Sequence, residues 1–227
     1  MPEWFAQSFP NVVSLWPEFL KAMGETLIML LWSGAIASVL GLILGLALTV
    51  TRKDGILKNL PLHKGLGFLI NFFRSIPFII LLTWVMPVSR FLMGSAINLQ
   101  GAIVPLIFGT VPFFCRQVES ALAQVSPGLI EAAESMGDSP WQIIVRVYLK
   151  ESIGPLARAL TITTVSLLGL TAMAGAVGAG GLGDFAIRYG HDRNMQDITW
   201  LVVITVALMV CVIELAGHYV IKKNTFE

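Results

Sequence analysis

TLIMLLWSGAIASVLGLILGLALTVT, residues 26–51, is a run of 26 residues without a charged side chain. Residues 91–115 and 159–183 form two further uncharged runs of 25 residues each. About 20 apolar residues in a helix are enough to cross the ~30 Å hydrocarbon core of a bilayer. These runs predict transmembrane helices, and they decide the fold class: an all-α integral membrane protein.

The composition of the chain supports a membrane protein with five spans. Of 227 residues, 56% are hydrophobic and 13% are charged, whereas soluble domains carry about 25% charged residues. Two weaker apolar runs, 66–88 and 198–221, are interrupted only by Arg74 in the first and by Glu214 and His218 in the second. Five spans place the two chain termini on opposite sides of the membrane.

The expected organisation has three parts. An aromatic-rich segment, residues 1–25, is interpreted as an external interfacial segment. A transmembrane domain follows over residues 26–221, and residues 222–227 form a tail. Within that domain we expect spans at about 26–51, 66–88, 91–115, 159–183 and 198–221, with a polar loop at 116–158.

The distribution of basic residues predicts the orientation. Eleven of the fifteen Lys and Arg residues fall on the side that carries the 116–158 loop and the C-terminus. Loops rich in Lys and Arg remain in the cytoplasm. We therefore expect the N-terminus outside and the C-terminus inside. The net charge of +1 gives no indication of a nucleic-acid partner.

The sequence GAGGLG, residues 178–183, has the G-x-G-x-x-G spacing of a dinucleotide-binding loop. That fingerprint requires a preceding strand in a soluble βαβ unit, and here the glycines end a membrane span. The sequence favours a packing role, because small residues at spacings of three and four let transmembrane helices approach closely. The residues that we assign to this packing are Gly175, Ala179, Gly180 and Gly183.

Other cofactor sites are not indicated by the sequence. No lysine follows a glycine, so there is no phosphate-binding P-loop. The two cysteines, Cys115 and Cys211, and the three histidines are scattered, which argues against a metal site. We expect no cofactor on this chain; ATP and Mg²⁺, if used, would bind to a partner.

The polar loop contains SPGLIEAAESMGDSPWQIIVRVYL, residues 126–149, which predicts two short helices around a turn. Ser126 is expected to cap the first helix and Gly137 to end it in a left-handed conformation. Ser139, followed by Pro140, is expected to cap the second helix in an S-x-x-Q capping box with Gln142. Four apolar residues give the first helix a face to bury: Leu129, Ile130, Ala133 and Met136. An amphipathic helix lying on the membrane surface is the alternative interpretation.

The same loop resembles the EAA-x3-G-x9-I-x-L-P signature of permease subunits of binding-protein-dependent ABC importers. The matching positions are Glu131, Ala132, Ala133, Gly137, Val147 and Leu149. The chain departs from the signature at Val147, which stands for isoleucine, and at Lys150, which replaces proline. The resemblance implies a type I ABC importer permease fold, in which this loop docks into a groove of the ATPase subunit.

In that interpretation, the coupling residues are Glu131, Ala132, Ala133, Gly137, Ser139 and Pro140. Small Ala132 and Ala133 would allow close approach to the groove. Glu131 would benefit from the helix macrodipole and meet a basic group of the partner. Gly137 would form the elbow between the two short helices.

Four stretches are similar to permease subunits of methionine importers in particular: NFFRSIPFIILLTWVMP (71–87), LQGAIVPLIFGTVPF (99–113), LIEAAESMG (129–137) and AMAGAVGAGGLG (172–183). The resemblance implies a location in the bacterial inner membrane. It also implies a homodimer of five-span subunits with two ATPase subunits on the cytoplasmic side and an external substrate-binding protein. The implied solute is an amino acid, most readily D- or L-methionine.

Three residues within the spans have candidate roles. Met173 interrupts the small-residue face of the fourth span, where two copies could close a translocation gate or merely fill a packing gap. Arg74 and Glu214 fall at similar distances from the cytoplasmic ends of their spans, so we expect them to pair within or between subunits. The alternative is that Arg74 extends alone to the lipid headgroups.

Two other classes of protein remain as alternatives to an ATP-driven permease. An ion-coupled secondary amino-acid transporter would need midplane carboxylates, often within inverted repeats, and neither is evident. A membrane enzyme would need clustered catalytic side chains within the bilayer, and none is evident either.

Overall fold

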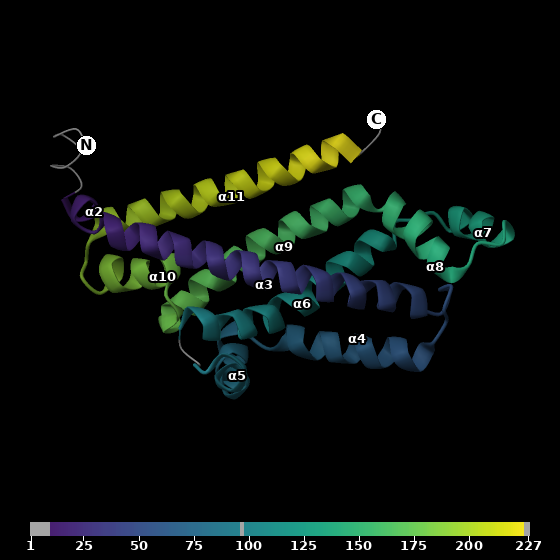
Figure 1. The fold of residues 1–227 in the computed structure, drawn as a ribbon, viewed down its shortest axis with the longest axis horizontal. Helices are drawn as coiled ribbons and strands as arrows, with labels where there is room; N and C mark the ends of the chain where they lie inside the picture. Colours follow the sequence, from purple (N-terminus) through teal and green to yellow (C-terminus); the bar gives the residue numbers. More distant parts are fainter. Residues whose placement is uncertain (1–9, 96–97, 225–227) are drawn as a thin grey trace. The chain divides into compact units, whose positions relative to one another are not determined.

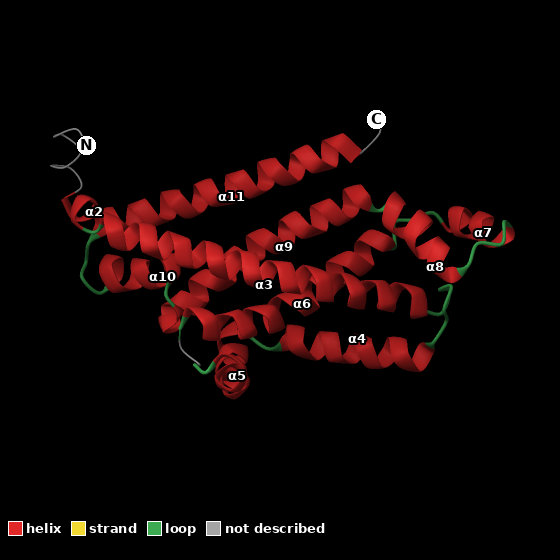
Figure 2. Cartoon of the chain, viewed as in Figure 1, coloured by secondary structure: helices red, strands yellow, loops and turns green. Residues whose placement is uncertain are grey.

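The computed structural model describes residues 10–95 and 98–224. Within these residues all regular structure is helical (Figure 1, Figure 2), as the all-α prediction requires. Nothing is described for residues 1–9 of the predicted interfacial segment, nor for residues 225–227 of the predicted tail.

Among the described residues, four helices are long and apolar enough to cross a membrane: α3 (Trp16–Thr51), α6 (Leu99–Leu122), α9 (Ile153–Ala174), which continues to Ala179, and α11 (Gln196–Asn224). A short helix, α2 (Pro10–Ser14), precedes α3. The sequence predicts a separate interfacial segment over residues 1–25. Because α3 begins at Trp16, residues 16–25 instead belong to the first long helix. Glu18 in the first turn of α3 lies where the helix macrodipole favours an acid.

The second predicted span is not one straight helix. It is divided into α4 (Leu60–Ser75) and α5 (Phe78–Met93), whose axes differ in direction by 110°. The break follows from Pro77, because a residue before proline is driven out of the helical region. Ile76 accordingly has extended backbone angles, with φ −84° and ψ 122°.

The third predicted span is displaced along the sequence. Phe91–Met93 complete α5, which ends at the left-handed Gly94 (φ 71°). Helix α6 starts at Leu99 and runs beyond Cys115 to Leu122. Within the helix the Arg116 guanidinium is paired: Nη1 donates to Glu119 Oε2 at 2.6 Å, and Nη2 donates to Gly67 O and Asn71 Oδ1 of α4 at 3.2 and 3.0 Å.

The chain forms two compact units. The first comprises Met1–Ala35, Pro77–Phe108 and Thr164–Ile213. In its described part, one core cluster surrounds Met29, Leu106 and Leu167. A second cluster joins α3 to α10 (Gly181–Phe185) and α11 through Phe19, Phe185 and Ile198.

The second unit comprises Ile36–Ile76, Gly109–Thr163 and Glu214–Glu227. In its described part, α6 packs closely on α3 because Gly41 and Gly45 have no side chains. A β-carbon at Gly45 would lie 2.6 Å from Cβ of Val118, and one at Gly41 would lie 2.7 Å from Phe114. Phe114 and Val118 in turn belong to the core cluster on which the 127–149 segment rests.

The GAGGLG stretch lies in the first unit and does not continue a straight helix. The α9 helix ends in the short segment η2 (Gly175–Ala179), which breaks at Val177 and Gly178, and α10 begins at Gly181. Positive φ angles of 95°, 84° and 76° occur at Gly178, Gly180 and Gly181. The predicted stripe of small residues along one helix is therefore interrupted.

The assigned glycines permit contacts inside this break. A β-carbon at Gly175 would lie 2.6 Å from the amide nitrogen of Asp184, and one at Gly183 would clash with the carbonyl of Ala172. Gly180 lies against the carboxylate of Glu25 on α3, and Ala179 is buried. These small residues thus bring the end of α9 close to α10 and α3 of the same chain.

Candidate functional site

The candidate site is the segment between α6 and α9 in the second unit. It contains α7 (Pro127–Ser135), α8 (Pro140–Ile143) and the π-helical segment η1 (Ile144–Leu149). Figure 1 shows α7 and α8 beside each other where the chain passes from α6 to α9. The predicted pair of short helices around a turn is confirmed.

A glycine elbow ends α7. Gly137 has φ 84°, its amide donates to Glu134 O at 3.0 Å, and the amide of Asp138 donates to Ala133 O at 3.1 Å. This is the hydrogen-bond pattern of a Schellman motif, in which a left-handed residue satisfies the last free carbonyls of a helix. The predicted left-handed conformation of Gly137 is confirmed.

A capping box starts α8. Gln142 N donates to Ser139 Oγ at 3.4 Å, while Ser139 N donates to Gln142 Oε1 at 2.7 Å, and Pro140 occupies the first turn. The predicted box is therefore confirmed. Ser126 occupies the N-cap position of α7, but its hydroxyl makes no capping bond, so that part of the prediction is wrong. The Schellman motif that ends α7 and the capping box that starts α8 are adjacent, so the turn at Gly137–Ser139 is fixed on both sides.

The two alanines of the EAA motif face opposite ways. Ala133 is 2% exposed and packs against Phe114 and Tyr148, whereas Ala132 is exposed. The small Ala133 side chain therefore packs α7 onto the core of its own chain, and Ala132 is the alanine of the pair that stays exposed.

Glu131 is exposed and forms no ion pair within the described residues. It is the fifth residue of α7 and lies beyond the first turn. The expected stabilisation by the macrodipole, which is confined to the first turn, does not apply. Its carboxylate is thus available to a group outside the chain.

Large apolar side chains also remain exposed around the elbow. Met136 is 77% exposed, Trp141 69% and Leu129 46%. Leu129 and Met136 were expected on the buried face of α7, but only Ala133 and the partly buried Ile130 lie there. Exposed large apolar side chains that gather outside a membrane span are candidate contacts for a partner. Sequence periodicity did not identify Met136 and Trp141 as exposed. The signal that could have done so is the presence of two large apolar residues on either side of a polar turn.

The segment η1, which follows α8, contains a buried tyrosine. Tyr148 is 1% exposed, and its hydroxyl has no hydrogen-bond partner within the described part of the chain. Burial raises the pKa of this phenol, an effect that the positive charge of Arg52 opposes. At Lys150, where the signature has proline, the backbone remains helical, with φ −68° and ψ −46°. The path from α8 towards α9 therefore stays helical through η1 and Lys150.

The remaining predicted site residues lie apart from this segment. Met173 is on α9 in the first unit and is 39% exposed. Arg74 lies in the last turn of α4 and Glu214 lies in α11; among the ion pairs of residues 10–95 and 98–224, none joins them. The same residues contain no group of three His, Cys, Asp or Glu side chains arranged to hold a metal.

Similar proteins of known sequence are methionine permeases. A probable D-methionine transport system permease protein MetI of Vibrio cholerae is 45% identical over 204 residues, covering 90% of this chain and 91% of that protein. The corresponding Pasteurella multocida protein is 41% identical over 211 residues, covering 91% and 97%. The D-methionine transport system permease protein MetI of Escherichia coli K12 is 46% identical over 156 residues, covering 69% and 72%.

Solved structures share the fold. A chain of the MetNI methionine ABC transporter in inward-facing conformations superposes with a TM-score of 0.92 at 41% identity, covering 94% of this chain and 99% of that one. A chain of an amino acid ABC transporter superposes with a TM-score of 0.77 at 16% identity, which shows the common fold alone. The all-helical type I permease architecture is thereby confirmed.

The family model for binding-protein-dependent transport system inner membrane components matches residues 37–222. That range includes the elbow at Gly137, the capping box at Ser139 and all of α4 to α9. The chain therefore belongs to the binding-protein-dependent transport system inner membrane component family, the permeases of ABC importers.

Proposed function

We propose that this chain is the membrane-spanning permease subunit of an ATP-driven importer of methionine. Support comes from relatives named as D-methionine permeases that cover about nine-tenths of the chain, and from the likeness to the MetNI chain. The chain contributes the pathway, and hydrolysis of ATP with Mg²⁺ takes place on a separate ATPase subunit. An ion-coupled secondary transporter is not favoured, because the relatives belong to the ABC class.

The elbow at Gly137 is the observation that carries the coupling role. A loop transmits force only if its ends are rigidly held. Here the Schellman motif and the Ser139 capping box fix the turn between α7 and α8, while Ala133 anchors α7 to the core of the second unit. Glu131, Ala132, Met136 and Trp141 form the exposed surface, named the coupling surface below, that docks on the ATPase.

The assembly that fits this role is a homodimer with two ATPase subunits and an external substrate-binding protein. Each subunit would cross the bacterial inner membrane five times, with α4 and α5 forming the broken second span. The charge distribution supports an external N-terminus and a cytoplasmic coupling segment. Five helices hardly enclose a pathway, whereas two copies about a two-fold axis do so.

Within such a dimer, Met173 on α9 is the proposed gate residue. Its 39% exposure in the single chain leaves it accessible to a second copy. Arg74 and Glu214 are exposed in the single chain, and we propose that they pair between subunits.

Co-purification and transport test the proposal. The chain, expressed with the ATPase encoded in its own genome, should yield a stable complex that takes up labelled methionine into proteoliposomes only with ATP and the binding protein. A matched complex with an ATPase unable to hydrolyse ATP is the control. Methionine uptake by the purified chain without any ATPase would refute the proposal.

A further inference from the structure

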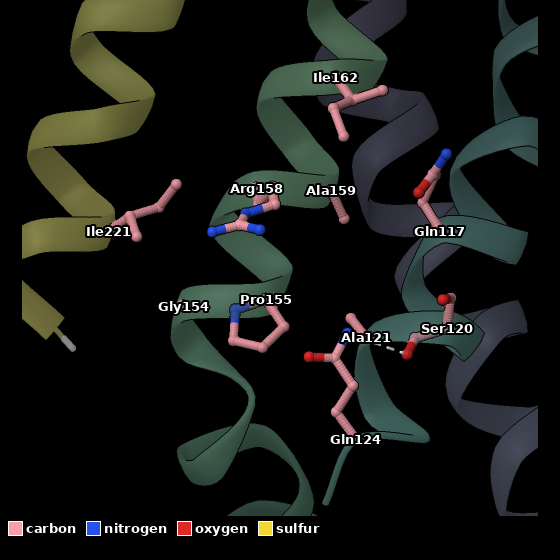
Figure 3. Close-up of a pocket in the computed structure, with 10 residues that line it drawn as sticks. All are labelled: Gln117, Ser120, Ala121, Gln124, Gly154, Pro155, Arg158, Ala159, Ile162 and Ile221. Carbon is pink, nitrogen blue, oxygen red and sulfur yellow. Dashed lines mark hydrogen bonds between the residues drawn. The ribbon is translucent and has the colours of Figure 1, made fainter.

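A cavity of about 400 Å³ lies in the second unit between the end of α6 and the start of α9, with α11 contributing one residue (Figure 3). Gln117 and Ser120 line it from α6, Gln124 lines it from the turn two residues beyond the end of α6, and Arg158 lines it from α9. The cavity is separate from the coupling surface, and none of its residues has a role in the function proposed above.

Arg158 has an uncommitted guanidinium. Its side chain is exposed at the cavity and forms no ion pair or hydrogen bond with any described residue. By contrast, Arg116 is paired with Glu119 and Arg188 with Asp184, each a carboxylate within four residues along the chain. A guanidinium presents planar, paired donors that match a carboxylate or phosphate. Arg158 is therefore placed to bind an oxyanion that comes from outside the chain.

The α6 side of the cavity supplies acceptors. Nε2 of Gln124 donates to Ser120 O at 3.4 Å, which leaves Oε1 of Gln124 as an open acceptor. In Figure 3 this carboxamide points toward α9, the helix that carries Arg158. Gln117 forms no hydrogen bond with any described residue and adds a second amide. Amide oxygens opposite a guanidinium suit a ligand that carries a positive donor close to its oxyanion.

The rest of the wall is apolar and limits the size of the ligand. Ala121, Ile162 and Ile221 line the cavity beside the polar groups. A volume of about 400 Å³ is at the lower end of the range of small-molecule sites, which runs from about 300 to 1,000 Å³. One free amino acid with an unbranched apolar side chain meets all three conditions: oxyanion, ammonium and apolar body.

A second cavity, in the first unit, lacks these properties. It is lined by Lys21, Glu25, Asp184 and Arg188, but these residues already form two ion pairs, Lys21 with Glu25 and Arg188 with Asp184. A ligand there would have to break existing pairs, whereas the Arg158 cavity offers an unpaired cation.

We infer that the Arg158 cavity is a release-side binding site for the transported amino acid. Arg158 holds the carboxylate, the carboxamides of Gln117 and Gln124 accept from the ammonium, and Ile162 and Ile221 contact the side chain. The inference rests on the proposed import function and on the orientation that places the start of α9 on the cytoplasmic side. An anionic lipid headgroup is the other source of an oxyanion.

Photolabelling tests this site without relying on turnover. The assembled complex in phosphatidylcholine nanodiscs is irradiated with photo-methionine, the diazirine analogue of methionine, and labelled peptides are mapped by mass spectrometry. We expect labels within residues 117–124 and 154–162, displaced by excess L-methionine but not by methioninamide, which lacks the carboxylate. Losing a charge-assisted pair should reduce this labelling about tenfold in Arg158→Gln, with an intermediate reduction in Arg158→Lys.

Controls separate the outcomes. Lys64→Gln removes an exposed cation of α4 outside the cavity and should be labelled like the wild type. If Arg158→Gln fails to assemble, Gln124→Leu replaces it and should lose the label. Unchanged labelling in both Arg158→Gln and Gln124→Leu would overturn the inference. So would displacement by phosphatidylglycerol but not by methionine, which would identify a lipid site. If the wild-type complex transports methionine but the cavity stays unlabelled, this inference fails and the import function stands; if transport itself is absent, the proposed function fails.

Discussion

Glu25 of α3 accepts a hydrogen bond from the amide of Gly181, with Oε2 2.8 Å from the nitrogen. The next amide, of Leu182, donates to Thr26 Oγ1 at 2.8 Å. Two side chains 156 residues away thus satisfy the first free amides of α10, the role that a local cap normally fulfils. The glycines leave room for this contact, since Gly180 and Gly181 lie against the same two side chains.

We predict that Glu25→Ala destabilises the first unit by about 1–2 kcal/mol, because loss of a helix cap costs this much. Glu25→Gln keeps an acceptor oxygen at the same place and should retain most of the stability. Thermal unfolding of the detergent-solubilised complex measures both. Equal melting temperatures for Glu25→Ala and the wild type would show that the cap contributes nothing.

The elbow predicts that a substitution at Gly137 impairs coupling without preventing assembly of the complex. Gly137→Ala meets no neighbouring atom within 4 Å but places an L side chain at positive φ, at a cost of about 1–2 kcal/mol. The turn should open, so ATP-driven uptake should fall several-fold while the complex still assembles.

Gly128→Ala is the matched control for that substitution. Gly128 lies within α7 without a positive φ, and a β-carbon there would be 3.7 Å from Ser126 Oγ, an ordinary contact. The change should raise helix stability by up to about 1 kcal/mol and leave uptake intact. A parallel loss of uptake in both variants would contradict the special role of the elbow.

The coupling surface makes a prediction at its exposed apolar residues. Met136→Gln and Trp141→Gln should change the stability of the chain by no more than about 0.5 kcal/mol, as expected for exposed positions. Both should weaken association with the ATPase, measured by co-elution and by uptake. Leu57→Gln, an exposed leucine in another loop of the same unit, is the control and should co-elute normally.

We predict that the chain tolerates removal of the Tyr148 hydroxyl. Its buried hydroxyl has no partner in the described part of the chain, so Tyr148→Phe removes an uncompensated polar group and should be neutral or stabilising. Tyr148→Ala should cost about 3–5 kcal/mol through the cavity it leaves. Unfolding measurements on the pair of variants check this, and marked destabilisation by Phe would reveal a partner for the hydroxyl.

We predict that the hydrogen bonds of Arg116 stabilise the packing of α6 against α4. Arg116→Met removes the bonds to Glu119, Gly67 and Asn71 and leaves a carboxylate unpaired. Because both side chains are about a quarter exposed, the cost should be about 1–3 kcal/mol, below that of a fully buried pair. Arg116→Met combined with Glu119→Leu should recover part of the loss. A double-mutant cycle measures the interaction, and strict additivity would exclude it.

Local features of the sequence were sufficient for much of the site. Uncharged runs such as residues 26–51 predict membrane helices because hydrocarbon tolerates few charges. Gly137 and Ser139 predict the elbow because left-handed backbone and helix caps depend on residues within one turn. The same reasoning missed the 110° break at Pro77. A proline is a local signal for such a break, but residues 66–88 were predicted as one span because they are apolar.

Other features depended on residues distant in sequence, and only the tertiary structure decided them. Periodicity does not tell Ala133, buried against Phe114 and Tyr148, from its exposed neighbour Ala132. Arg116 of α6 finds its acceptors on α4, and the glycines at 178–183 form a turn capped by Glu25 rather than a straight packing stripe. The sequence alone determined that the chain is built from long apolar helices of membrane type, since that property follows from local composition, but it did not determine where the second and third predicted spans begin and end. Which side chains pair or remain exposed depends on contacts across the fold, and these exist only once the helices have packed.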